Sequence, residues 1–349
     1  MLYIVIWLII VGIIVVYLSI DEKKENINQK FDYKNTDFFY ELKKIEIKND
    51  NILKLKEKVQ EYIIWTDNLI NSIIVAILSD GHILVEWVPG LAKTRTILVF
   101  SKLLWLNFKR VQFTPDMLPS DIIGWEIYNK NTWKFEIFKW PIFTNLLLAD
   151  EINRATPKVQ SALLEAMQEK KVTIGNETFV LNKPFFVMAT QNPLEQEWTF
   201  PLPEAQLDRF LFKVNVTYPS KEEEKLIMDA FDKNIDNIES IFSSDSLLKM
   251  QEDIKNIKIE DREKKYIVDI VDATRKNEKI EVGASTRAVI ALKKASLTVA
   301  YLQWKEKVSI DDIKKVLLLV LRHRVKLKYN VNEPLEKILI ETFIKVNDL

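Results

Sequence analysis

The chain has 349 residues, enough for two domains and a terminal segment, and its 50 basic and 50 acidic residues cancel. A chain without net charge gives no general attraction for nucleic acid, and the absence of cysteine excludes disulfides, thiolate metal sites and cysteine nucleophiles. Its two histidines, His82 and His323, are too far apart in sequence to suggest a metal site. For His323 we expect a structural or helix-capping role.

The N-terminal residues 2–20 form an uncharged apolar run that is long enough to cross a bilayer. A cleaved signal peptide is disfavoured because a basic leading region and a small-residue cleavage site are missing. A buried core helix is the remaining alternative. The lysines that follow the run predict a single-pass anchor in the inner (cytoplasmic) membrane, with the rest of the chain in the cytoplasm. Residues 21–50 are polar and are predicted to be a spacer.

The first motif of the core joins an apolar run, 83–85, to a helical stretch expected over 93–106. Such a loop points backbone NH groups at a phosphate chain beside a helix N-terminus. Lys93 is expected to contact the β- and γ-phosphates of ATP, and the Thr94 hydroxyl to contact Mg²⁺. The pattern G-x-x-x-x-G-K-[ST] is broken at both glycines, so a chance strand-turn-helix stays open. The motif consists of Trp87, Val88, Pro89, Gly90, Leu91, Ala92, Lys93 and Thr94.

Two further apolar runs end in polar residues. The first, 145–149, is followed by Asp150 and Glu151, and adjacent carboxylates beside a core are costly unless they are paired or bind a metal. We expect Asp150 to hold Mg²⁺ and Glu151 to orient or activate the attacking water; a capping acid is the alternative. The second run leads to Asn192, which is expected to contact the γ-phosphate or the attacking water, or else to be a plain turn residue before proline. Such strands suit a doubly wound α/β ATPase with a parallel sheet.

A helical region follows the strands. Ser220 and the acids after it predict a helix start, and helical periodicity recurs to the C-terminus. We therefore assign residues 51–218 to an α/β nucleotide-binding core and 219–349 to an all-helical lid. The helical stretches are predicted at 226–231, 264–276, 285–302, 310–321 and 334–346.

Five segments make the chain resemble the MoxR family of AAA+ ATPases over roughly residues 55–330. The resemblance implies a P-loop core with a helical lid that binds ATP and Mg²⁺. It makes Lys93 and Thr94 the Walker A pair, Asp150 and Glu151 the Walker B pair, and Asn192 sensor 1. The segments are FTPDMLPSD at 113–121, LADEINRA at 148–155, QSALLEAM at 160–167, ATQNP at 189–193 and LPEAQLDRF at 202–210.

The same resemblance gives roles to two arginines. Arg209 matches the position that reaches the γ-phosphate of the neighbouring subunit, and Arg287 matches sensor 2 in the lid. Without the resemblance, each would be expected in a surface salt bridge. An arginine that acts on a neighbour implies a homo-oligomeric ring, expected to be a hexamer. The resemblance further implies chaperone-like remodelling or maturation of client proteins, with von Willebrand factor A domain proteins as candidate partners.

Two hairpins are predicted within the core, at 121–138 and at 172–181. In ATPases that the chain resembles, such hairpins face the axis of the ring and contact client proteins. From the residues alone, hairpins that only connect neighbouring elements, without contacting a client, are equally expected.

Seven of the nine tryptophans of this chain fall where the family has glycine. The chain has 6 glycines and 9 tryptophans, whereas glycine ordinarily makes up about 7% of residues. An indole at Trp87 would block the close approach of the loop to phosphate. We hypothesise that the source organism reads UGA as glycine and that the natural protein carries glycine at these positions. The seven tryptophans concerned are Trp65, Trp87, Trp105, Trp133, Trp140, Trp198 and Trp304.

Two other functions stay open beside a membrane-anchored ATPase. If Trp87 is genuine, the chain is a catalytically inactive, nucleotide-insensitive scaffold. A nucleic-acid remodeller shares the fold, but no basic patch supports it, so no nucleic-acid partner is expected.

Overall fold

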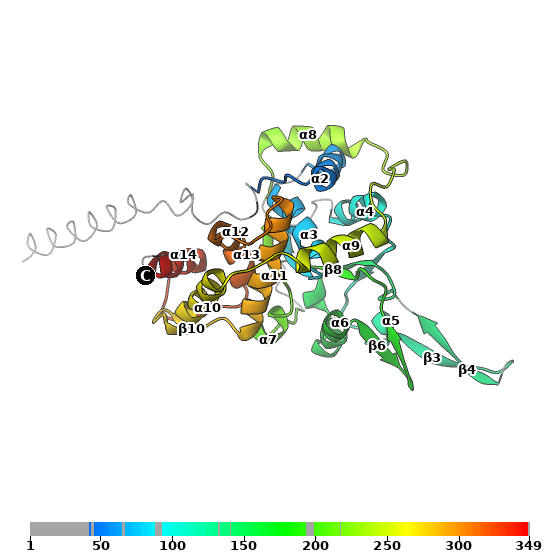
Figure 1. Ribbon diagram of the computed structural model, residues 1–349. Helices are drawn as coiled ribbons and strands as arrows, with labels where there is room; N and C mark the ends of the chain where they lie inside the picture. Colours follow the sequence, from blue (N-terminus) through cyan, green and yellow to red (C-terminus); the bar gives the residue numbers. More distant parts are fainter. Residues whose placement is uncertain are drawn as a thin grey trace, which may run out of the picture. The chain divides into compact units, whose positions relative to one another are not determined.

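The computed structural model describes residues 42, 45–64, 67–87, 93–131, 133–139, 141–192, 199–216 and 218–347 (Figure 1). The predicted membrane anchor, residues 2–20, and the loop residues 88–92 lie outside these ranges. Of the helices within these ranges, none has the length and apolar character needed to cross a bilayer.

A five-stranded parallel sheet forms the centre of the core and confirms the predicted α/β fold. Its strand order is β2-β5-β8-β1-β9, and all four neighbouring pairs are parallel. The carboxyl ends of all five strands therefore lie along one edge. Two of the strands, β2 and β9, were not predicted, because they mix charged and apolar residues. The strands are β1 (Ile83–Trp87), β2 (Phe108–Gln112), β5 (Leu146–Asp150), β8 (Phe186–Gln191) and β9 (Phe212–Val216).

Helices pack against the sheet and hold it in place. Helix α3 is buried from Asn68 to Leu78 because it packs against strands β1 and β9 and against α11 of the lid. Helix α6 begins with Pro157 in its first turn, where the missing N–H costs nothing, and Lys170 is its C-cap residue. The core helices are α2 (Asp50–Tyr62), α3 (Asp67–Leu78), α4 (Lys93–Leu103), α5 (Ser120–Ile123), η2 (Ile152–Arg154), α6 (Pro157–Glu169) and α7 (Glu204–Leu207).

Both predicted hairpins are present. One pairs β3 (Gly124–Asn129) with β4 (Lys134–Lys139), and the other pairs β6 (Lys171–Ile174) with β7 (Glu177–Val180). The β3-β4 hairpin extends away from the sheet (Figure 1). It exposes four large apolar side chains, namely Ile127, Tyr128, Phe135 and Phe138.

The lid is helical, but three details correct the prediction. The stretch 310–321 forms two short helices, α12 and α13, and helix α9 was not predicted. The lid is also not all-helical, because β10 (Ile280–Val282) and β11 (Lys326–Leu327) form a two-stranded sheet. Strands of two or three residues leave no periodicity to detect. The helices after the core are α8 (Lys221–Phe231), α9 (Ser244–Lys255), α10 (Asp261–Lys276), α11 (Thr286–Leu302), α12 (Ile310–Lys314), α13 (Leu317–Leu321) and α14 (Leu335–Asn347).

Three tryptophans adopt a backbone conformation that favours glycine. Trp105, Trp133 and Trp304 have φ angles of 51°, 55° and 55°, in the left-handed region that a bulky side chain rarely occupies. Trp105 follows α4 and Trp304 follows α11. At each, the next residue donates its N–H to the carbonyl five residues before it, as in a Schellman helix end with glycine at the left-handed position. All three indoles are largely exposed, so packing compensates little of the strain, although the Trp304 ring lies 6.2 Å from the Tyr301 ring.

Candidate nucleotide site

The carboxyl edge of the sheet brings Lys93, Asp150, Glu151 and Asn192 together. Lys93 is the first residue of α4, and its Nζ lies 3.7 Å from Oδ1 of Asp150 at the end of β5. Thr94 follows Lys93 in the same helical turn. Asn192 directly follows β8, the neighbour of β5, and is buried. The parallel register therefore gathers the residues that three separate motifs supply.

Asp150 is a buried carboxylate surrounded by donors. The Thr190 hydroxyl donates a 2.6 Å hydrogen bond to Oδ1, and Nη2 of Arg110 lies 2.8 Å from Oδ2. Burial raises the pKa of the Asp150 carboxyl, but Thr190, Arg110 and Lys93 outweigh burial and keep the pKa below its ordinary value. A buried, ionised carboxylate close to the Thr94 turn is the oxygen ligand that Mg²⁺ prefers, so these residues fit a magnesium site.

Several contacts restrain the backbone and the side chain of Glu151. Its backbone has a φ of 57°, in the left-handed region, and its N–H donates to the Thr190 hydroxyl at 3.0 Å. The Gln112 amide donates to Oε2 of Glu151 at 2.7 Å, and Arg154 forms an ion pair with the same oxygen at 3.2 Å. Left-handed backbone at a non-glycine residue is strained, and such strain concentrates at functional sites.

Arg110, Gln112 and Thr190 belong to the site but were not predicted. Arg110 and Gln112 lie on β2, whose Gln112 is in register with Asp150 on β5. Because the sequence does not show that β2 and β5 are neighbours, no local signal could have assigned the two β2 residues.

Arg209 and Arg287 lie together, but at the amino-terminal ends of the strands, opposite the carboxyl ends where Lys93 and Asp150 lie. Both line a cavity of about 330 Å³ whose wall includes Gly81 and His82, the residues that precede β1. Nη1 of Arg209 donates to the Leu164 carbonyl at 3.2 Å. The structure therefore brings Arg287 to Arg209 and not to Lys93 of the same chain.

A buried arginine of the lid fixes the loop that carries Arg209. Arg324 follows α13, and its Nε donates to Oδ1 of Asp208 at 2.7 Å. Its other donors reach the backbone carbonyls of Asp208 and Leu211 at 3.1 and 3.2 Å. Burial lowers the pKa of Arg324 to about 10, while Asp208 opposes the shift. Arg324 was not predicted, although the charged residues within three positions of the end of the apolar helix α13 were a detectable signal.

Both histidines are buried and structural. His82 Nδ1 accepts a hydrogen bond from the Val187 N–H at 3.0 Å, and its Nε2 lies 3.1 Å from the Met167 carbonyl. His323 Nε2 lies 3.0 Å from the Phe210 carbonyl. Burial is the largest cause that keeps the pKa of each imidazole well below its ordinary value. Within the part of the chain that the structure describes, no group of three acidic, histidine or cysteine residues could by itself hold a metal ion.

Comparison with known proteins identifies the family. Residues 82–212 match the ATPase family associated with various cellular activities (AAA), and residues 272–341 match the AAA lid domain. Chaperone MoxR1 of Mycobacterium tuberculosis is 44% identical over 282 residues, which span 78% of this chain and 75% of that protein. The chain belongs to the MoxR family of AAA+ ATPases. This MoxR-family protein is accordingly an ATPase.

Other proteins similar to this chain cover comparable shares of it. The uncharacterised YeaC of Bacillus subtilis is 46% identical over 256 residues, 73% of this chain and 80% of YeaC. Protein MoxR of Methylorubrum extorquens is 25% identical over 305 residues, 80% of this chain and 88% of that protein. The crystal structure of a candidate ATPase from Cytophaga hutchinsonii superimposes with a TM-score of 0.79 at 41% identity, covering 85% of this chain and 94% of that one.

Proposed function

We propose that this MoxR-family ATPase hydrolyses ATP at sites formed between copies of the chain in a ring, with six copies expected. The observation that supports this is the position of Arg209 and Arg287 at the sheet edge opposite Lys93 and Asp150. Strand β1 separates the two edges, and its five residues span about 17 Å. A nucleotide on Lys93 is thus out of reach of its own two arginines, and a second copy would supply them.

Each residue then has a defined task in hydrolysis. Lys93 binds the β- and γ-phosphates, and Thr94 and Asp150 would hold Mg²⁺, which neutralises phosphate charge when bound. Glu151 orients the attacking water and Asn192 contacts the γ-phosphate. Arg209 and Arg287 of the neighbouring copy stabilise the charge that develops on the transferred phosphoryl group.

We also propose that glycine stands at the seven tryptophan positions in the natural protein, so that the loop at 87–92 is intact. The left-handed backbone at Trp105, Trp133 and Trp304 supports this, because it is the conformation for which glycine is selected. Trp125, which matches no family glycine, lies on strand β3 and has no positive φ. The seven codons test the proposal: codons other than UGA at most of these sites would contradict it.

The turnover of ATP would serve to remodel or mature client proteins. The name of the MoxR1 relative supports a chaperone-like role. The β3-β4 hairpin supports contact with clients, because it exposes Tyr128 and Phe135, whose rings lie 5.3 Å apart. Von Willebrand factor A domain proteins are candidate clients by family resemblance. We further propose that residues 2–20 anchor the chain in the inner membrane, with the ATPase in the cytoplasm.

The decisive experiment compares ATP turnover of two full-length chains, one with the seven tryptophans and one with seven glycines. We expect turnover from the glycine chain only, because an indole at position 87 obstructs the phosphate loop. In the glycine chain, Arg209→Ala should bind ATP but hydrolyse little. Unchanged turnover in that variant would refute the role of Arg209 between copies. A glycine chain that assembles but neither binds nor hydrolyses ATP would favour the scaffold.

A further inference from the structure

The cavity that holds Arg209 and Arg287 carries an excess of positive charge. Five cationic side chains line it, against two carboxylates, Asp80 and Asp208. Both carboxylates already have partners: Asp208 accepts from buried Arg324 and lies 3.8 Å from Nη1 of Arg287, and Asp80 pairs with Lys170 at 3.1 Å. The cavity is therefore built to receive an anion. The cations are Lys170, Arg209, Arg287, Lys294 and Arg324.

Lys294 shares one face of α11 with Arg287. The cavity wall takes Arg287, Ile290, Ala291 and Lys294 from this helix, a spacing of three, four and seven residues that keeps side chains on one face. Two helical turns place Lys294 about 10 Å along the axis from Arg287. The long, flexible lysine stem allows its ammonium group to approach an anion that Arg287 also contacts.

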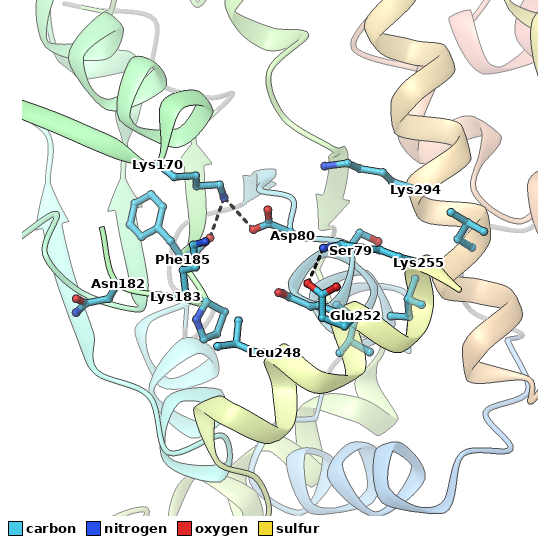
Figure 2. A pocket seen from close by; sticks show the side chains of 15 residues that line it. Ser79, Asp80, Lys170, Asn182, Lys183, Phe185, Leu248, Glu252, Lys255 and Lys294 are labelled. Carbon is cyan, nitrogen blue, oxygen red and sulfur yellow. Dashed lines mark hydrogen bonds and ion pairs between the residues drawn. The ribbon is translucent and has the colours of Figure 1, made fainter. Parts of the chain in front are cut away.

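Lys294 lacks a carboxylate partner among the residues that the structure describes. Figure 2 shows its side chain, which lines the adjoining cavity, pointing from α11 in the direction of Lys170 and Asp80. Both Lys170 and His82 have a lowered pKa, chiefly through burial, and in each case the charge of Lys294 adds to that lowering. Lys294 thus faces positive charge, and Asp80 is occupied by Lys170. A bound anion would relieve this repulsion.

We propose that Lys294 is a third cation, beside Arg209 and Arg287, that contacts the phosphate chain of the nucleotide bound by the neighbouring copy. This rests on the between-copy site proposed above. The nucleotide of the same chain lies at the opposite sheet edge, so it cannot be the anion. A polyphosphate is compact enough for a cavity of about 330 Å³ and carries enough charge to satisfy three cations.

The test mixes copies that are defective in different halves of the site, all with glycine at the seven positions. Arg209→Ala copies keep Lys93 but lack the arginine, and Lys93→Ala copies keep the arginine but lose their nucleotide site. Mixed rings should regain turnover only where an intact Lys93 meets an intact Arg209. This mixture is the reference for Lys294.

Lys294→Met is then placed in one copy at a time. In the Lys93→Ala copy, which donates the cations, it should lower the regained turnover about fivefold, as for loss of a charged phosphate contact. In the Arg209→Ala copy it should change nothing. Lys293→Met is the matched control, because Lys293 is exposed and does not line the cavity. It should have no effect in either copy.

The outcomes separate the two proposals. If the reference mixture regains turnover, and Lys294→Met lowers it equally in both copies or in neither, only the proposed role of Lys294 is overturned. A reference mixture that regains no turnover would overturn the between-copy site and the role of Lys294 with it. Because Lys294 is exposed, its removal is not expected to unfold the protein, and equal thermal unfolding midpoints would verify this.

Discussion

The side-chain amide of Gln112 donates a 2.7 Å hydrogen bond to the Glu151 carboxylate, the group assigned to orient the attacking water. An oxygen engaged in this bond is less available to water. The contact crosses from the end of β2 to the end of β5, and Arg154 occupies the same oxygen at 3.2 Å. In this arrangement Glu151 is restrained before hydrolysis begins.

The first prediction follows from that bond. Gln112→Ala in the glycine chain should raise basal ATP turnover about fivefold, since a hydrogen bond to a charged group contributes roughly 1 kcal/mol or more. Phosphate release at steady state measures it. Glu151→Gln should abolish turnover with or without Gln112→Ala, which shows that the rise depends on Glu151. Unchanged or lower turnover in Gln112→Ala would contradict the restraint.

The second prediction concerns the link between the lid and the Arg209 loop. Arg324→Met should lower the free energy of unfolding by about 3–5 kcal/mol, because it leaves Asp208 and several backbone carbonyls without their buried donor. Lys326→Met is the control, since Lys326 is half-exposed and its ion pairs with Glu204 and Glu281 are 3.4 and 3.9 Å long. That variant should change stability by less than about 0.5 kcal/mol. If urea unfolding shows the same loss of unfolding free energy in Arg324→Met and Lys326→Met, the assigned role of Arg324 is contradicted.

The third prediction tests the glycine positions without reference to activity. Trp105→Gly, Trp133→Gly and Trp304→Gly should each stabilise the fold by about 1 kcal/mol, because glycine adopts the left-handed backbone without a steric penalty. The three sites lie on separate elements, so the effects should add. Trp125→Gly should instead destabilise the protein, because Trp125 pairs with Phe138 inside a hairpin ladder. Destabilisation at the three left-handed sites would argue that the indoles are native.

The fourth prediction concerns pH. His82 and His323 are buried and have pKa values well below those of an unfolded chain, so the unfolded state binds more protons as pH falls. Stability should therefore be highest above about pH 7 and fall as pH drops through 6.5, with a slope that approaches about 1.4 kcal/mol per pH unit for each histidine only below that pH. Urea unfolding between pH 5.5 and 7.5 measures the slope. His323→Gln should halve that slope; an unaltered slope would contradict the assignment.

The sequence by itself determined the residues that act within one contiguous motif. Lys93 and Thr94, and likewise Asp150 and Glu151, are adjacent in the chain, and each pair follows a run of buried apolar residues that a strand requires. Local periodicity also located the two hairpins and most lid helices. These features depend on interactions between near neighbours, which a sequence displays directly.

Only the tertiary structure decided which distant residues meet. Gln112 reaches Glu151 because β2 lies beside β5, and strand order leaves no trace in the periodicity of either strand. The same is true of Arg209 and Arg287, because packing of α11 against the core places both at the end of the sheet opposite Lys93. It is also true of Arg324, whose guanidinium donates to backbone carbonyls of the loop before β9. The family resemblance of the sequence predicted a role for both arginines. Only the packing of the chain shows that they share a cavity away from Lys93.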